Sequence, residues 1–76
     1  MKEILESMLK PLNDNKEAIS INQEDKDKIT VIEVRVAPED MGKVIGKEGK
    51  IAKAIRTILR AVGTKEHKKV TVEFMD

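Results

Sequence analysis

With 76 residues, the chain is long enough for one small domain with a modest core, and we expect a single domain over residues 1–76. The absence of cysteine excludes disulfides, thiolate zinc sites and a thiol nucleophile. The formal net charge is only +1, but residues 1–40 carry −4 whereas residues 41–69 carry +7. Positive charge concentrated in one part of an otherwise acidic chain favours the attraction of polyanions.

Aromatic residues are almost absent, since Phe74 is the only one. Modules that stack bases on several Phe, Tyr or Trp side chains, such as RNA-recognition motifs and cold-shock folds, are therefore disfavoured. No apolar run approaches the roughly 20 residues of a membrane span. The first residues carry acids, unlike a signal peptide. Together with the lack of cysteine, these features predict a cytoplasmic protein that does not bind membranes.

The first predicted element is a helix over residues 2–12, because apolar residues recur there at helical spacing. Pro11 lies near its end and lacks a backbone donor, so the helix either stops or bends there. The polar residues 13–15 are typical of a turn.

Two strands are predicted next. Ile19 and Ile21 alternate with polar residues and indicate a short strand over residues 17–23, followed by a charged hairpin loop over residues 24–28. Residues 29–36 are largely β-branched and alternating, and they predict the strongest strand. One face of this strand carries Thr30, Ile32, Val34 and Val36.

A short helix and a longer one follow. Pro38 and the acids after it favour a helix start, and Gly46 and Gly49 interrupt the helical pattern. The longer helix is predicted over residues 50–62, with Gly63 as its C-terminal stop. Its predicted apolar stripe consists of Ile51, Ala54, Ile55, Ile58, Leu59 and Val62.

The remaining residues predict a basic loop over residues 63–69 and a last strand over residues 70–74. The resulting order is helix, strand, strand, helix, helix, strand. It predicts an α/β (α+β) two-layer sandwich, a three-stranded sheet with helices on one face. The connection through both later helices favours a parallel pairing of the last two strands.

The turn Gly46-Lys47-Glu48-Gly49 joins the two later helices. Glycine accepts positive φ angles and lets a ligand approach the backbone closely. Amides at the start of the following helix favour an anion, and Lys47 and Lys50 add positive charge. A nucleic-acid phosphate suits this arrangement, although two glycines also form a plain helix–helix corner.

A row of bases strengthens this interpretation. Lys50, Lys53, Arg56 and Arg60 recur at intervals that place them along one helical face. No acid occurs between Lys50 and Lys65, whereas a merely solvated helix usually mixes charges of both signs. The pattern therefore favours nucleic-acid binding over a face that serves only solubility.

Other site types do not match the sequence. Residues 42–47 resemble a phosphate-binding Walker loop, but the loop is one residue short and Glu48 replaces the Ser or Thr that holds magnesium. A Gly-x-Gly dinucleotide fingerprint is absent. His67 is the only histidine and has no partner at a readable spacing, so we interpret it as a surface residue. We predict no catalytic residue, metal site, cofactor or small-molecule substrate.

At this point the sequence resembles a known family. The run from Val44 to Gly49, between two helices and after a β-branched strand, resembles the GxxG core of a KH domain, and the order of elements is similar to the bacterial type II arrangement. The resemblance covers essentially the whole chain and is most specific for the small single-domain bacterial KH proteins of the KhpA family. The stretches that carry it include Ala37-Pro38-Glu39-Asp40-Met41-Gly42-Lys43 and Ile51-Ala52-Lys53-Ala54-Ile55-Arg56.

The resemblance implies a cleft for about four single-stranded nucleotides. It implies an apolar floor made by Val44, Ile45, Ile51 or Ala52, and Ile55, with the loop 63–69 at the border of the cleft. The implied RNA-binding residues are Lys43, Val44, Ile45, Gly46, Lys47, Glu48, Gly49, Lys50, Ile51, Lys53, Ala54, Arg56 and Arg60.

For partners, the resemblance implies single-stranded RNA and either a homodimer or a heterodimer with a KhpB-like KH protein. It also implies post-transcriptional regulation or RNA chaperone activity, with links to cell shape and cell division. We therefore expect a non-enzymatic RNA-binding protein. The alternative is a protein-interaction or dimerisation module that acts with a larger KH partner and contacts RNA only weakly.

Overall fold

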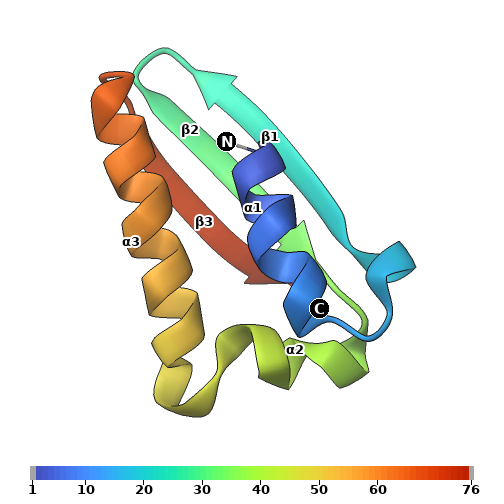
Figure 1. Ribbon diagram of the computed structural model, residues 1–76. Helices are drawn as coiled ribbons and strands as arrows, with labels where there is room; N and C mark the ends of the chain where they lie inside the picture. The colour runs from blue at the N-terminus through green and yellow to red at the C-terminus, as the bar shows by residue number, and fades with distance from the viewer. Residues whose placement is uncertain (1, 76) are drawn as a thin grey trace.

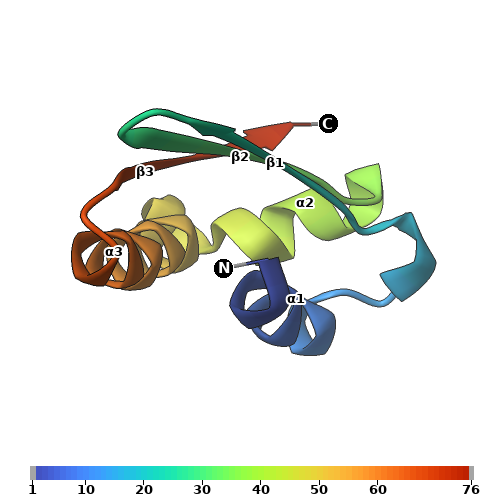
Figure 2. The ribbon, with the colours of Figure 1, turned by 90° about the horizontal axis from the view of Figure 1, so that it is seen from above.

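The computed structural model describes residues 2–75. Within them, three α-helices cover one face of a three-stranded sheet, which gives two layers (Figure 1 and Figure 2). This confirms the predicted α+β sandwich and the order of elements that the type II KH resemblance implied. The helices are α1 (Lys2–Leu9), α2 (Pro38–Ile45) and α3 (Lys50–Lys65), and the strands are β1 (Ser20–Lys26), β2 (Ile29–Arg35) and β3 (Lys69–Met75).

The strand order in the sheet is β1-β2-β3, so β2 is central and β3 is an edge strand. β1 pairs with β2 antiparallel, and β2 pairs with β3 parallel, as the sequence predicted. The register places Ile32 opposite Val72 and Thr30 opposite Val70. All four of these side chains are buried, so this row of residues fixes the sheet face that the helices cover.

The core lies between the sheet and the helices. β2 contributes the alternating residues that the sequence placed on one face, and Leu5 and Leu9 of α1 close the core from the opposite layer. Burial of apolar surface of this kind is the main favourable term in folding. The buried cluster comprises Leu5, Leu9, Ile21, Ile32, Val34, Val36, Val44, Ile55, Leu59, Val70 and Val72.

The first half of the chain differs from the prediction at its element boundaries. The helix ends at Leu9 and continues as a 3₁₀ turn over Lys10–Leu12, because Pro11 removes a donor. A second 3₁₀ turn occupies Lys16–Ala18, where a strand was predicted. β1 instead extends to Lys26 and pairs with Ile29, which leaves a short turn between them. The charged residues 24–26 belong to a strand because β1 is an edge strand, where charged side chains are tolerated.

The end of α3 also differs from the prediction. Gly63 is not a helix stop, since α3 continues to Lys65. The stop is at His67, whose φ of +59° is left-handed. The N–H of His67 donates to the carbonyl of Thr64 (3.1 Å) and the N–H of Lys68 to that of Gly63 (2.8 Å), which is a Schellman motif. The loop is therefore confined to residues 66–68 rather than 63–69.

Gly63 serves packing instead. A Cβ at this position would lie 2.8 Å from the carbonyl oxygen of Lys68 and would overlap the Val70 side chain. The glycine thus allows the last turns of α3 to approach β3 closely. The sequence contains the glycine but does not distinguish this role from a helix stop.

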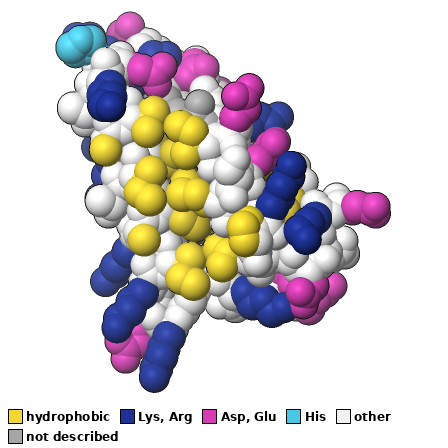
Figure 3. All heavy atoms as spheres, in the orientation of Figure 1, with side chains coloured by type: hydrophobic (Ala, Val, Ile, Leu, Met, Phe, Trp, Pro, Cys, Tyr) yellow, Lys and Arg dark blue, Asp and Glu magenta, His cyan; other side chains and the backbone are white. Residues whose placement is uncertain are grey.

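The buried stripe of α3 is rotated from the predicted one. Ala52 and Gly63 are buried with Ile55 and Leu59, whereas Ala54 and Ile58 are exposed. Ile58 is 46% exposed and Ile4 of α1 is 41% exposed. Figure 3 shows hydrophobic side chains gathered over α1 and α3 on the face away from the sheet. In the part of the chain that the structure describes, no helix has the length and apolar character needed to cross a membrane.

Candidate functional site

The turn between α2 and α3 has the conformation that its glycines predict. Gly46 has φ +78° and Gly49 has φ +73°, and Glu48 between them is also left-handed at φ +58°. The Gly49 N–H donates to the Gly46 carbonyl (3.2 Å), which closes a 3₁₀ turn over Lys47–Gly49. Three residues with positive φ within four positions reverse the chain direction sharply between the two helices.

The two glycines are needed for different reasons. A Cβ on Gly46 would lie 2.6 Å from Cγ1 of Ile51, so this position requires both the positive φ and the missing side chain. A Cβ on Gly49 would meet nothing within 4 Å, so only its positive φ favours glycine. Open space over Gly49 leaves the backbone there accessible to a ligand.

The start of α3 adds positive potential at this turn. Gly49 is the N-cap residue and offers no side-chain acceptor to the first amides of α3. The first turn of α3 also contains no acid. Lys47 and Lys50 are exposed on either side of Gly49. The Gly49 and Lys50 N–H groups already donate to the carbonyl oxygens of Gly46 and Lys47. An anion at this place would therefore meet the positive end of the helix dipole and two mobile ammonium groups.

Lys43, one of the predicted RNA-binding residues, forms its contacts away from the glycine turn. Its Nζ forms an ion pair with Asp14 and lies 3.7 Å from Oδ1 of the buried Asp40. The neighbouring Asp14 raises the pKa of Lys43. Oδ2 of Asp40 accepts the N–H of Asn15 (2.9 Å), and this bond is the main cause that lowers the pKa of Asp40. Lys43 therefore ties α2 to the segment before β1.

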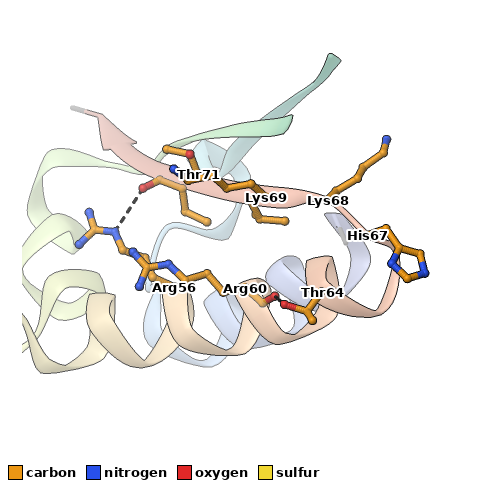
Figure 4. A pocket seen from close by; sticks show the side chains of 9 residues that line it. Arg56, Arg60, Thr64, His67, Lys68, Lys69 and Thr71 are labelled. Atoms are coloured by element: carbon orange, nitrogen blue, oxygen red, sulfur yellow. Dashed lines mark hydrogen bonds between the residues drawn. The ribbon is translucent and has the colours of Figure 1, made fainter. Parts of the chain in front are cut away.

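A hollow of about 700 Å³ lies between α3 and the edge strand β3 (Figure 4). We call it the α3–β3 cleft. Arg56, Arg60 and Thr64 come from successive turns of α3 and line one wall, while the other wall is β3. The complete lining is Arg56, Arg60, Thr64, His67, Lys68, Lys69, Val70, Thr71 and Val72.

A smaller hollow of about 380 Å³ continues along α3 toward the glycine turn. Lys53 and Thr57 line it together with Arg56 and Arg60, which also line the α3–β3 cleft. The predicted basic face of α3 thus connects the turn at one end of the helix with the cleft near the other. α3 has 16 residues, which corresponds to about 24 Å of helix.

Arg56 is held in place by β3. Its Nε donates to the carbonyl oxygen of Val72 (3.2 Å), and its guanidinium lies 5.4 Å from the ring centroid of Phe74. The only aromatic residue of the chain is therefore a support for an arginine, by a cation–π contact, rather than a surface for stacking bases. Figure 4 shows Arg56 and Arg60 on α3 facing β3 across the cleft.

The loop 66–68 closes the far end of the cleft. Lys68 Nζ lies 3.4 Å from Oδ1 of Asp25 on β1, and the Lys69 N–H donates to the carbonyl of Lys28 (2.9 Å). A hydrogen bond from Thr30 (2.8 Å) is the main cause that lowers the pKa of Asp25. The β1–β2 hairpin therefore fixes the position of this loop. His67 is exposed and lines the cleft, whereas the sequence indicated only a surface residue.

The apolar floor that the resemblance implied is not open. Val44, Ala52 and Ile55 are core residues with at most 3% exposure, and Ile45 and Ile51 are half-buried. Ala54 is exposed but does not line the cleft. Val70 and Val72 of β3 line the cleft, but they are also core residues, each 4% exposed. The chain reverses at residues 66–68, so β3 runs back along α3 and brings these residues, with Lys69 and Thr71, to the site. Local sequence patterns carry no signal for this pairing.

Metal ligands are not grouped anywhere within residues 2–75, where no three His, Asp or Glu side chains lie close enough to hold an ion. The arrangement is instead a basic track of backbone amides, lysines and arginines that runs from the turn to the cleft. Such a track suits an extended polyanion.

Comparison with known proteins agrees with this geometry. The family model "KhpA/KhpB, KH domain" matches residues 2–74. The chain is 49% identical over 75 residues to the "RNA-binding protein KhpA" of Clostridium perfringens, covering 99% of this chain and all of that protein. It is 46% identical over 76 residues to the protein of the same name from Listeria monocytogenes, covering all of both chains.

Aquifex aeolicus also has an "RNA-binding protein KhpA" that is 46% identical over 76 residues, which is all of this chain and 96% of that protein. No solved structure gave a significant match. The family match spans both the glycine turn and the α3–β3 cleft. The chain belongs to the KhpA/KhpB family of KH domains.

Proposed function

We propose that this protein binds single-stranded RNA without catalysing a reaction, as an RNA chaperone or post-transcriptional regulator in the cytoplasm. The turn Gly46–Gly49 and the first amides of α3 hold the phosphate backbone. The basic face of α3 and the α3–β3 cleft take the nucleotides that follow. The name "RNA-binding protein KhpA" of the relatives supports an RNA ligand rather than another polyanion.

The observation that carries this proposal is the continuity of the basic track. The exposed bases Lys47, Lys50 and Lys53 and the two arginines of the cleft follow one another from the glycine turn along α3. No acid lies on α3 between Lys50 and Lys65. Phosphates bound along such a track release counterions, so the affinity depends steeply on salt.

The test is fluorescence-anisotropy binding of a mixed-sequence single-stranded RNA over a salt series. The variant Lys47→Asp, Glu48→Asp keeps both glycines and places two carboxylates at the turn. Asp also tolerates the left-handed conformation that Glu48 adopts. We expect affinity of the parent protein to fall steeply with salt, and the variant to lose at least about tenfold in affinity.

The chain offers a matched control. Lys16 and Glu17 form the same dipeptide in another exposed 3₁₀ turn, Lys16–Ala18, away from α3. The variant Lys16→Asp, Glu17→Asp has an identical change in net charge and should bind nearly as well as the parent protein. Equal loss in both variants, or equal weak binding by all three proteins, would contradict the assignment of the turn as the RNA site.

A second candidate function is self-association or pairing with a KhpB-like KH protein. Ile4 of α1 and Ala54 and Ile58 of α3 are exposed. Figure 3 shows hydrophobic side chains gathered on the face that carries these two helices. Exposed apolar patches of this kind mark interaction surfaces when they are contiguous. Sedimentation analysis of the parent protein and of Ile58→Lys tests this candidate: a dimer that the substitution dissociates supports it, and a monomeric parent protein refutes self-association.

A further inference from the structure

We propose that Arg56 selects a guanine base in the α3–β3 cleft, an inference that rests on the proposed RNA-binding function. The simplest role for Arg56 would be a phosphate contact, which is the role proposed above for the other basic residues of α3. Three observations distinguish Arg56 from them: its anchoring, its surroundings and the chemistry of the cleft.

Arg56 is anchored at both its Nε and its flat face. The Nε donates to the carbonyl of Val72, and Phe74 lies 5.4 Å from the guanidinium carbon. These contacts leave the paired N–H groups of Nη1 and Nη2 free for a ligand. A guanidinium with a fixed plane presents two parallel donors, which match two acceptors on one edge of a planar group.

The surroundings of Arg56 suit a base more than a phosphate. Arg56 is half-buried, whereas Lys53 and Arg60 are exposed. Val70 and Val72 line the same cleft but are only 4% exposed, so it is the partial burial of Arg56 itself that disfavours a strongly hydrated phosphate there. The exposed lysines and the glycine turn supply phosphate contacts farther along α3, so the strand backbone is held without Arg56.

The lining of the cleft discriminates among bases by what it lacks. None of the described lining residues is Asp, Glu, Asn or Gln. The Hoogsteen edge of adenine needs an acceptor beside a donor, which Asn or Gln supplies, and the amino group of cytosine prefers a carboxylate. Guanine presents two acceptors, O6 and N7, and both can accept from the two parallel N–H groups of one guanidinium, which we call the arginine fork. The carbonyl of Val72 already accepts a hydrogen bond from Arg56 itself.

The experiment compares short single-stranded RNAs that differ at one base. The probes are a uridine heptamer with a central guanine, the same heptamer with a central adenine, and a third with 7-deazaguanine, which lacks the N7 acceptor. For the parent protein we expect the guanine probe to bind at least about fivefold more tightly than the other two.

Two variants separate the effect of the two parallel donors of Arg56 from the effect of its positive charge. Arg56→Lys keeps the positive charge but has no parallel donors, and we expect it to bind the guanine and adenine probes equally. Arg60→Lys is the matched control, because Arg60 lies one turn further along the same cleft. Unlike that of Arg56, the Arg60 guanidinium forms no hydrogen bond within the described residues. The Arg60→Lys variant should retain the guanine preference, even if both affinities fall. Thermal unfolding checks that both variants fold.

The outcomes separate the two proposals. Binding of all probes with equal affinity, or a uniform loss in Arg56→Lys with the preference intact, overturns the role of Arg56 and leaves RNA binding standing. Equal affinity for the guanine and 7-deazaguanine probes also overturns the role of Arg56, because the proposed contact requires the N7 acceptor. Absence of salt-dependent binding to every probe overturns the RNA-binding function, and the base preference with it.

Discussion

The close approach of α3 to β3 at Gly63 can be tested by adding a single methyl group. In Gly63→Ala, the new Cβ would lie 2.8 Å from the carbonyl oxygen of Lys68 and would overlap Val70. One of these neighbours is backbone and cannot rotate away, so either the helix or the strand must shift. Overpacking of this kind costs about 1–3 kcal/mol, and a clash with backbone lies toward the upper end of that range.

The same substitution has a favourable effect that must be subtracted. Alanine is favoured over glycine inside a helix by about 0.8–1.0 kcal/mol. The net expected loss for Gly63→Ala is therefore about 1–2 kcal/mol in the free energy of unfolding. For a domain of this size, 1 kcal/mol corresponds to a shift of roughly 4–8 °C in melting temperature, so a fall of about 5–15 °C is expected.

Gly42 provides the control within the same chain. It lies inside α2, and a Cβ at this position would meet nothing within 4 Å. Gly42→Ala should therefore raise the free energy of unfolding by about 0.5–1 kcal/mol through helix propensity alone. Urea unfolding followed by circular dichroism measures both variants. If Gly63→Ala proves as stable as Gly42→Ala, the close packing of α3 on β3 is not the reason for this glycine.

Three further predictions concern other parts of the fold. Leu59→Ala removes a fully buried side chain of α3 and should cost about 2–5 kcal/mol in urea unfolding, whereas Ile58→Ala next to it, at a half-exposed position, should cost far less. His67→Gly relieves the left-handed conformation at the end of α3 and should raise the free energy of unfolding by about 1 kcal/mol; an unchanged melting temperature would argue against strain there. The pKa of Asp40 is lowered below its usual 3.8 by the Asn15 N–H, so its ionised form stabilises the fold and that stabilisation is lost as the pH falls through this range. The stability of Asp40→Asn should accordingly fall less between about pH 5 and pH 2 than that of the parent protein, and parallel pH profiles of the two would contradict this role.

The features that the sequence predicted well are those that depend on local patterns. The alternation through β2 identified its buried face, because the helices cover only one side of the sheet to which this strand belongs. The glycine turn was predicted with its positive φ angles because no other residue type adopts them as readily. The row of bases on α3 was likewise readable, since helical spacing alone places Lys53, Arg56 and Arg60 together.

The features that the sequence missed depend on contacts between distant segments. A glycine near the end of a helical pattern is typical of a helix stop, and only the close approach of β3 explains why Gly63 lies inside α3. The predicted apolar stripe was wrong at Ala54 and Ile58 because the rotation of α3 is set by its packing on the sheet. The ion pair of Lys43 with Asp14 was not predicted, because Asp14 lies far away in the sequence. Such pairings are tertiary and leave no local pattern.

The parallel pairing of β3 with β2 has a consequence for the order of folding. β3 follows both α2 and α3 in chain order, so its register with β2 closes a loop that contains two helices. Long-range parallel pairings of this kind form late because the loop must be ordered first. One wall of the α3–β3 cleft and the carbonyl that anchors Arg56 belong to β3. The glycine turn thus depends on contacts between neighbouring helices, whereas the cleft exists only where β3 has paired with β2.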